Sequence, residues 1–520
     1  MIKKSLPFLL LIILFSACEN NAPPADFLQQ DIPVADKIKK LLQPAYTKQL
    51  GIDETGRKHL REFYKQRNFA PLWSNDSILT ETGIELKRIL RTPVLLGLPA
   101  KRYKQFKWSK NHLKNELIIA SMLSVMSQDL RHGLLDTLEK EYKPIAYTPV
   151  EQLGQLYAFP EQPEAIAKKL LLLGPADSTY QALAHGLFAF ASTYPLAEKP
   201  FKVPTMKADS VNALVQTRKV LVAKGYLSGE QADSTQYDKA IRLFQRHNGQ
   251  KEDAVIGENT ALALMESNLK KCKRTALAME KWRWKSGFPD KYIWINIPEY
   301  KLRFFIHDSL KSENRIVVGK FENQTPEFEA KLRAIIAFPY WNVPFSITSK
   351  EFLPAAKSNP GYFARNHMKL YQKGLEIDPL TVAWKKIRDK TFPYKVTQDP
   401  GRWNSLGIIK FEFSNKYGVY VHDTPSKGLF NTTIRSYSHG CVRCEHPVQL
   451  GKLILLRDEN HMLPDSLDSI LSRGVNRTIQ LKRTIPIYLD YISVIPDWKG
   501  GIVFLKDIYK RDEKYLAYLF

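Results

Sequence analysis

Apolar side chains recur every three to four positions through much of residues 38–205, which is the period of a helix with one buried face. The tripeptide Gly97-Leu98-Pro99 is a turn signal that interrupts this repeat. The pattern therefore predicts a helical N-terminal region. Its clearest helical segments are 38–42, 60–64, 85–90, 113–130, 165–173 and 180–190.

A second, smaller helical unit is predicted over residues 206–272. Helices are expected at 211–224, 237–247 and 260–269, and the first two end before Gly225 and Gly249. Their apolar positions predict a small core of their own.

Beyond residue 275 the apolar positions follow the pattern of β-strands, with β-branched and aromatic residues alternating or in short runs. Residues 346–400 interrupt the strands with helical, Pro-rich and polar sequence. We therefore expect a multidomain α+β protein with a β-rich C-terminal domain that carries an insertion, followed by a final strand and helix within 501–520. Strands are expected at 292–297, 301–306, 315–318, 334–338, 407–413, 417–421 and 485–495.

The first eighteen residues decide the expected compartment. Lys3 and Lys4 precede an apolar run over 6–15, which is the layout of a secretory signal and is too short to span a membrane. The small residues before Cys18 resemble a bacterial lipoprotein signal, which implies that residues 1–17 are removed and that Cys18 is lipidated. Residues 18–37 then form a tether, and the protein faces the periplasm from the inner or outer membrane. The alternative is a plain secretion signal.

Composition fits a folded protein with an anionic partner. The chain has 520 residues, of which 44% are hydrophobic and 25% charged, and 77 Lys and Arg against 53 Asp and Glu give a net charge of +24. Such charge suits nucleic acid, a membrane surface or an anionic wall polymer. The basic residues are dispersed, and the densest cluster, 270–274, is too short for a nucleic-acid arm, so we expect no nucleic-acid partner.

The hexapeptide over 438–443, Ser-His-Gly-Cys-Val-Arg, carries the candidate chemistry. The chain has only four cysteines, too few for a disulfide-stapled scaffold, so a free cysteine in an exported protein is a candidate nucleophile. A nucleophilic Cys441 needs a base, positive charge that favours the thiolate, and donors for an oxyanion. His422, His439 and Arg443 can supply the first two, and Gly440 lets backbone N–H groups converge.

These residues resemble the active-site signature of L,D-transpeptidases, which have a YkuD-like catalytic domain. That signature is a His, about sixteen residues, then Ser/Thr-His-Gly-Cys and a nearby Arg, and here sixteen residues separate His422 from His439. Other segments resemble the large YcbB-like branch of the family. They include 280–284, 296–298, 318–320, 325–326, 341–344, 346–347, 360–362, 400–401, 404–407, 410–411 and 422–425.

The resemblance implies a domain order. A scaffold domain is expected at 38–205, and 63–73 looks like its opening. A peptidoglycan-binding-like domain of three helices is expected at 206–272, on the rhythm of Phe244-Gln245, Ile256-Gly257 and Thr260. The catalytic domain is expected at 275–500, with residues 346–400 as a lid, and the terminal strand and helix at 501–520.

The resemblance also implies roles and no cofactor or metal. Cys441 is the nucleophile, and His422 is the general base, its ring oriented by a carbonyl, plausibly that of Asp423. We expect the thiol to work as an ion pair with histidine. The remaining implied roles are a pocket function for His439 and an oxyanion hole from the N–H groups of Gly440 and Cys441. Ser438 and Arg443 are expected to support the loop or bind a carboxylate, Tyr340 and Trp341 to flank the site, and Asp423 to contact the substrate.

The implied reaction is acyl transfer on peptidoglycan stem peptides. A tetrapeptide donor would acylate the cysteine and release D-alanine, and an amine of a second stem would resolve the thioester to a 3→3 cross-link. Hydrolysis, D-amino-acid exchange and linkage of the wall to another protein stay open. The alternative from a different class is a non-catalytic wall-anchoring lipoprotein. We expect a monomer.

The run Cys441-Val-Arg-Cys444 also permits other readings. Together with His439 and His446 it could bind zinc, or it could be a redox pair. Cys444 itself is either a small buried hydrophobe or the partner of Cys441 in a regulatory disulfide. Cys272 is placed in a basic linker as a plain thiol.

Overall fold

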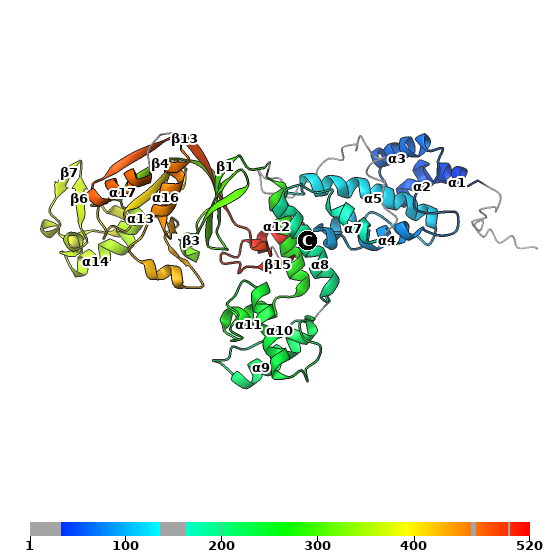
Figure 1. The fold of residues 1–520 in the computed structure, drawn as a ribbon, viewed down its shortest axis with the longest axis horizontal. Helices are drawn as coiled ribbons and strands as arrows, with labels where there is room; N and C mark the ends of the chain where they lie inside the picture. Colours follow the sequence, from blue (N-terminus) through cyan, green and yellow to red (C-terminus); the bar gives the residue numbers. More distant parts are fainter. Residues whose placement is uncertain (1–32, 136–162, 198, 286, 459–463, 498–499) are drawn as a thin grey trace, which may run out of the picture.

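A computed structural model describes residues 33–135, 163–197, 199–285, 287–458, 464–497 and 500–520. The predicted signal peptide and Cys18 lie outside these residues. Figure 1 shows an elongated molecule with three lobes: a helical lobe that starts the chain, a β-rich lobe at the opposite end, and a small lobe formed around α9–α11. None of the helices in these ranges is long and apolar enough to cross a membrane.

The helical lobe forms where the sequence pattern predicted it. Side chains of Asp53, Thr80, Asn111 and Asp177 cap the first turns of four of its helices by accepting backbone N–H groups. The long helix α5 is buried along most of its length and forms the centre of the lobe. The helices are α1 (Val34–Leu41), α2 (Pro44–Gln49), α3 (Glu54–Gln66), α4 (Glu81–Leu90), α5 (His112–His132), α7 (Pro163–Leu171) and α8 (Ser178–Thr193).

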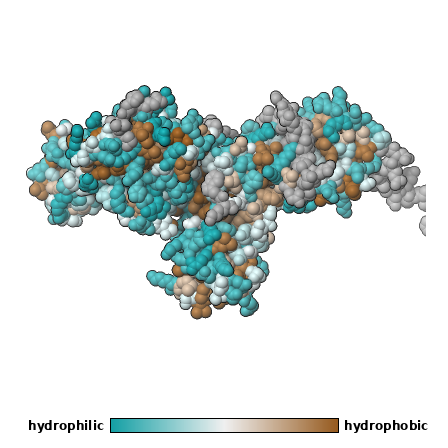
Figure 2. Space-filling model, viewed as in Figure 1, coloured by the Kyte–Doolittle hydropathy of each residue, from teal (hydrophilic) through white to brown (hydrophobic). Residues whose placement is uncertain are grey.

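The small lobe consists of α9 (Ser210–Ala223), α10 (Ser234–His247) and α11 (Glu258–Met265). Its own core includes Leu221, Ile241, Phe244 and Leu264. The predicted helix 260–269 is wrong in extent: α11 ends at Met265, and Ser267 caps a new helix. Figure 2 shows a mostly hydrophilic face with hydrophobic atoms gathered at the tip of this lobe, beside α9.

The long helix α12 (Asn268–Arg283) joins all three lobes. It carries Cys272 fully buried in the core of the helical lobe, where burial raises the pKa of the thiol to about 12. The prediction that Cys272 lies in a linker is therefore wrong. The basic residues around Cys272 indicated an exposed linker, but they belong to a helix that buries one face and pairs several of its cations with acids. The guanidinium of Arg274, for example, lies 3.0 Å from Asp512 and 2.9 Å from Glu266.

The C-terminal segment returns to the helical lobe. The hairpin of β14 (Val494–Asp497) and β15 (Gly501–Phe504) precedes α18 (Asp512–Leu519). Ile502, Phe504 and Tyr515 share one core with α8 and α12. The end of the chain therefore lies beside α8 and α12, as Figure 1 shows, and the helical lobe is completed by residues more than 300 positions away.

Within the described residues, the β-rich lobe is built on a nine-stranded sheet of order β11-β3-β12-β10-β9-β4-β13-β1-β2. Strand β2 also pairs with β3, so the sheet closes on itself. Helices α16 (Pro447–Leu456) and α17 (Pro464–Arg473) contribute to its core. The strands are β1 (Lys291–Asn296), β2 (Lys301–Ile306), β3 (Ser309–Gly319), β4 (Phe328–Ala337), β9 (Ile409–Phe413), β10 (Val421–His422), β11 (Ser436–Ser438), β12 (Val442–Cys444) and β13 (Arg477–Asp490).

The inserted segment folds as a module with its own core. The core includes Trp341, Phe352, Phe363 and Trp384, and the Phe363 and Trp384 rings stack with centroids 5.0 Å apart. Besides the expected helical turns, the module contains a four-stranded sheet, β5-β8-β6-β7, and it starts earlier than predicted. These elements are β5 (Trp341–Asn342), α13 (Phe345–Ile347), η4 (Thr348–Phe352), α14 (Leu353–Ser358), α15 (Tyr362–Arg365), β6 (Met368–Gln372), β7 (Leu375–Ile377) and β8 (Lys395–Gln398).

Candidate active site

The pairing of two short strands brings the predicted cysteine and histidine segments together. Strand β10 lies parallel to β12, with Val421 opposite Val442 and His422 opposite Arg443. Because side chains alternate along a strand, the two buried valines face one side of the sheet. His422 and Arg443 therefore share the other side, and Cys441, two residues before Arg443, lies on that side as well.

The segment before β10 is a turn rather than the predicted strand over 417–421. The side chain of Asn415 accepts the N–H groups of Tyr417 and Val419, each at 3.1 Å, and Gly418 adopts a positive φ of 66°. This Asn side chain competes with strand pairing, so only Val421–His422 joins the sheet. The turn places the Gly418 carbonyl oxygen 3.9 Å from the Cys441 Sγ.

The Cys441 thiol is partly buried among its neighbours. Burial raises its pKa above the ordinary value, while hydrogen bonds from Tyr420 and the positive charges of Lys410 and Arg443 act in the opposite direction. The Tyr420 hydroxyl contacts this thiol and also contacts the Trp341 side chain, so the inserted module reaches the nucleophile through Tyr420. At neutral pH the thiol is protonated in this conformation.

The imidazole of His422 is buried, and its Nδ1 contacts the backbone carbonyl oxygen of Asp423. Burial, together with the Arg443 charge, lowers the pKa of His422 to about 3. The ring is therefore neutral at pH 7, with Nδ1 as the N–H donor to Asp423, which leaves Nε2 unprotonated. The expected resting thiolate–imidazolium pair is wrong for this conformation, because desolvation raises the pKa of the Cys441 thiol and lowers the pKa of His422.

Hydrogen bonds within the loop 438–441 stabilise its conformation. Ser438 is buried, and its hydroxyl donates to the carbonyl oxygen of Cys441 and accepts the Gly440 N–H at 3.1 Å. The Gly440 carbonyl oxygen accepts the Thr325 hydroxyl at 2.9 Å. Gly440 has φ of 115°, a conformation that favours glycine.

This arrangement changes the predicted oxyanion hole. The Gly440 N–H is already satisfied by Ser438, so it is not an open donor here. The N–H of Cys441 donates no hydrogen bond to any residue that the structure describes. Of the two predicted donors, only the N–H of Cys441 is therefore available to an oxyanion in the described structure.

Arg443 is a half-buried cation beside the thiol. Its Nε is buried without a hydrogen-bond partner in the described chain, and burial lowers the pKa of its guanidinium. Asp423, predicted to bind substrate, is engaged inside the protein instead: its carboxylate accepts the Ile408 N–H at 3.1 Å and pairs with Lys427.

The other predicted site residues divide between the catalytic loop and the inserted module. His439 is partly exposed, and its Nε2 contacts Glu351 of η4. Trp341 is buried, whereas Tyr340 is 52% exposed and extends from the same edge of the module. The structure thus adds Tyr420, Glu351 and Thr325 to the predicted set. Sequence reasoning missed them because their partners lie between 21 and 115 positions away.

Cys444 points away from the site. It is fully buried in the core of the β-rich lobe, as is Val442, and its Sγ lies 3.3 Å from the Glu445 carbonyl oxygen. Residues 441 and 444 are three apart on a strand, so they face opposite sides. This geometry disfavours a disulfide or a shared metal between them, and burial raises the pKa of the Cys444 thiol well above its ordinary value.

Two families match parts of this chain. Residues 290–461, which contain Cys441 and His422, match the L,D-transpeptidase catalytic domain, called YkuD. Residues 58–187 match the scaffold domain. The chain therefore contains a segment that matches the L,D-transpeptidase catalytic domain and another that matches the scaffold domain. It has the YcbB-like combination of a scaffold domain and an L,D-transpeptidase catalytic domain.

One curated relative and two solved structures are similar to parts of this chain. A Haemophilus influenzae protein named "Putative L,D-transpeptidase" is 34% identical over 223 residues, which cover 43% of this chain and 45% of the relative. The chain thus matches less than half the length of that relative. L,D-transpeptidase structures from Mycobacterium smegmatis and Xylanimonas cellulosilytica are each 12% identical, cover 39% and 57% of this chain and 58% and 99% of their own, and have TM-scores of 0.17. Scores this low support no argument about the fold.

Proposed function

We propose that this protein is a peptidoglycan L,D-transpeptidase that forms 3→3 cross-links through a thioester on Cys441. The donor is a tetrapeptide stem, and D-alanine is the leaving group. The acceptor is the side-chain amine of a second stem. The shared face of Cys441, His422 and Arg443 on β10 and β12 is the observation that carries this proposal.

In the acylation step His422 acts as the general base. Its neutral imidazole takes the thiol proton as the sulfur attacks the carbonyl carbon of the stem's L,D-peptide bond. The N–H of Cys441 donates to the oxyanion. When the carbon–nitrogen bond breaks, the same proton passes to the leaving D-alanine amine, and the thioester remains.

In the second step the acceptor amine attacks the thioester. His422 takes the proton that the amine loses and returns it to the departing sulfur, which restores the thiol. Arg443 is positioned to bind a carboxylate of the donor, since no acid of the described chain neutralises it. Ser438 supports the loop, and His439, Tyr340 and Trp341 border the stem.

The remaining parts of the chain are assigned as follows. The inserted module acts as a lid, to which Glu351 and Trp341 give a direct connection with the site. Lobe α9–α11 is a peptidoglycan-binding-like domain. The protein is exported and lipid-anchored at Cys18 in the cell envelope, a proposal supported by the sequence of its first eighteen residues and by its positive charge.

The test is the intact mass of the protein after mixing with a purified disaccharide-tetrapeptide. We expect an adduct that lacks D-alanine, followed by a cross-linked product, and no adduct with Cys441→Ala. Hydrolysed stems alone would identify a carboxypeptidase, and incorporation of added D-amino acid would identify exchange. Absence of any adduct in folded, reduced protein would refute catalysis and favour the wall-anchoring alternative.

A further inference from the structure

The peptide unit between Gly440 and Cys441 carries the open N–H donor at one end and a bonded carbonyl at the other. The described chain contains no cis peptide bond, so the Cys441 N–H points away from the Gly440 carbonyl oxygen. That oxygen accepts the Thr325 hydroxyl at 2.9 Å. Because the atoms of a peptide unit lie in one plane, the bond to the carbonyl also sets the direction of the N–H.

The Thr325 side chain is fully buried, and its hydroxyl is engaged both as donor and as acceptor. Besides donating to Gly440, it accepts the Gly319 N–H at 2.9 Å. Gly319 pairs with Ser438 where β3 meets β11, so the hydroxyl joins two strand ends beside the catalytic loop. A hydroxyl has one proton, so these two bonds together fix its orientation.

Two residues of the C-terminal segment hold the backbone of Thr325. The Tyr509 hydroxyl accepts the Thr325 N–H at 3.2 Å and donates to the Gly319 carbonyl oxygen at 2.5 Å. The Arg511 guanidinium donates to the Thr325 carbonyl oxygen at 2.9 Å. The C-terminal segment therefore sets the position of Thr325, and Thr325 sets the position of the Gly440 carbonyl.

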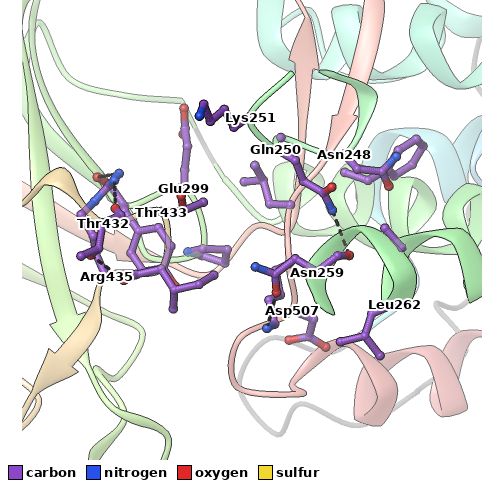
Figure 3. A pocket seen from close by; sticks show the side chains of 18 of the residues that line it. Asn248, Gln250, Lys251, Asn259, Leu262, Glu299, Thr432, Thr433, Arg435 and Asp507 are labelled. Carbon is purple, nitrogen blue, oxygen red and sulfur yellow. Dashed lines mark hydrogen bonds between the residues drawn. The ribbon is translucent and has the colours of Figure 1, made fainter. Parts of the chain in front are cut away.

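The C-terminal segment is in turn anchored away from the site. The Tyr509 ring stacks on Tyr491 with centroids 5.5 Å apart, and the Tyr509 N–H donates to the Tyr491 hydroxyl at 2.8 Å. That hydroxyl donates to Asp507, which lines a cleft between the small lobe and the β-rich lobe where Lys and Arg outnumber Asp and Glu (Figure 3). Asp507 accepts the Asp512 N–H at 3.1 Å, and Asp512 pairs with Arg274 of α12 at 3.0 Å. A continuous series of polar contacts thus leads from α12 to the catalytic loop.

We propose that Thr325 and Tyr509 are positioning residues for acyl transfer: Thr325 orients the Cys441 N–H toward the oxyanion, and Tyr509 holds Thr325 in place. This inference rests on the proposed function, because the N–H direction matters only if Cys441 attacks a carbonyl. A misplacement of roughly 1 Å can cost about 10²-fold in rate. Both side chains are buried, so their loss should lower the maximal acylation rate and leave the half-saturating stem concentration unchanged.

The experiment compares Thr325→Val, which replaces the hydroxyl by a methyl group, with Thr325→Ser, which keeps the hydroxyl. Full-length protein in detergent is mixed with disaccharide-tetrapeptide, and single-turnover acylation is followed by intact mass. We expect Thr325→Val to lower the maximal rate about 10- to 100-fold and Thr325→Ser to lower it less than about threefold. Thr275→Val is the matched control, because it removes a buried threonine hydroxyl of α12 that donates to the Lys271 carbonyl oxygen at 2.9 Å, and it should leave the rate unchanged.

Alkylation by iodoacetamide distinguishes an oriented oxyanion donor from a general disturbance of the site. The Cys441 sulfur forms a carbon–sulfur bond as iodide leaves and His422 takes the thiol proton, and no oxyanion forms. We therefore expect the alkylation rate of Cys441, followed on its own peptide by mass, to stay within about twofold of wild type in Thr325→Val. Tyr509→Phe keeps the stacked ring and should likewise slow acylation and spare alkylation.

Three results would overturn the proposal. The first is an acylation rate in Thr325→Val equal to that of the wild type. The second is an equal loss of acylation and alkylation, and the third is a loss in Thr325→Ser or Thr275→Val as large as that in Thr325→Val. Urea unfolding checks each variant, and if Thr325→Val does not fold, Tyr509→Phe decides by the same comparison. A wild type that is not acylated would refute the transpeptidase function and this inference with it, whereas an acylated wild type with unaffected variants would refute this inference alone.

Discussion

The burial of His422 leads to a specific pH dependence of acylation. An ordinary histidine with a pKa of about 6.5 would be only about 3% neutral at pH 5, so a rate that depends on it would fall about thirtyfold between pH 8 and pH 5. With the pKa of His422 lowered to about 3, the ring stays neutral across this range. Lowering the pKa of His422 from about 6.5 to about 3 corresponds to about 5 kcal/mol against protonation of the ring in the folded protein.

We therefore expect the single-turnover acylation rate, measured by intact mass with a disaccharide-tetrapeptide, to change less than twofold between pH 5 and 8. Arg443→Gln removes a charge that lowers the pKa of His422. In this variant the pH at which acylation slows should therefore rise, while burial keeps the pKa of His422 below 6.5. His307→Gln, an exposed histidine, is the control and should leave the profile unchanged. A wild-type rate that falls tenfold or more with a midpoint near 6.5 would refute the neutral-base reasoning.

Four further substitutions test the site and the fold. Gly440→Ala meets no atom closer than 3.8 Å, so its cost is backbone strain of about 1–3 kcal/mol, and it should slow acylation without a steric clash. Ser438→Ala leaves two loop groups unpaired, which should lower the free energy of unfolding by about 1–3 kcal/mol and the acylation rate at least tenfold, as read by urea melts and intact mass. Cys444→Ser should keep most acylation activity with and without reductant, and a loss equal to that of the nucleophile mutant would restore the metal or redox reading. Glu280→Ala removes the buried partner of Arg283 and should destabilise the helical lobe by about 3 kcal/mol in urea unfolding, whereas a change below 1 kcal/mol would contradict the pairing.

The sequence alone indicated where the candidate site lies along the chain and the order of the elements. The segments that contain His422 and Cys441 are short sequence motifs. Such motifs can be recognised without knowing which distant residues contact them. Helices and strands were also predictable where one face is buried, because burial imposes a period on the sequence. The strand over 417–421 was predicted wrongly because the Asn415 side chain captures the backbone N–H groups there.

Only the tertiary structure decided what surrounds these residues. Tyr420 and Trp341 reach Cys441 from a turn and an inserted module, and Glu351 meets His439 across 88 positions of chain. The charge state of the His422–Cys441 pair followed from burial, since desolvation depends on everything packed around a group rather than on its neighbours in sequence.

The same limit applies to the architecture. The sequence determined that a helical region, a small three-helix unit and a β-rich domain follow one another. It did not determine that the final twenty residues pack with α8 and α12, or that a positively charged cleft separates two lobes. Contacts between residues hundreds of positions apart leave no periodic signal in either segment, so the chain shows them only once it is folded.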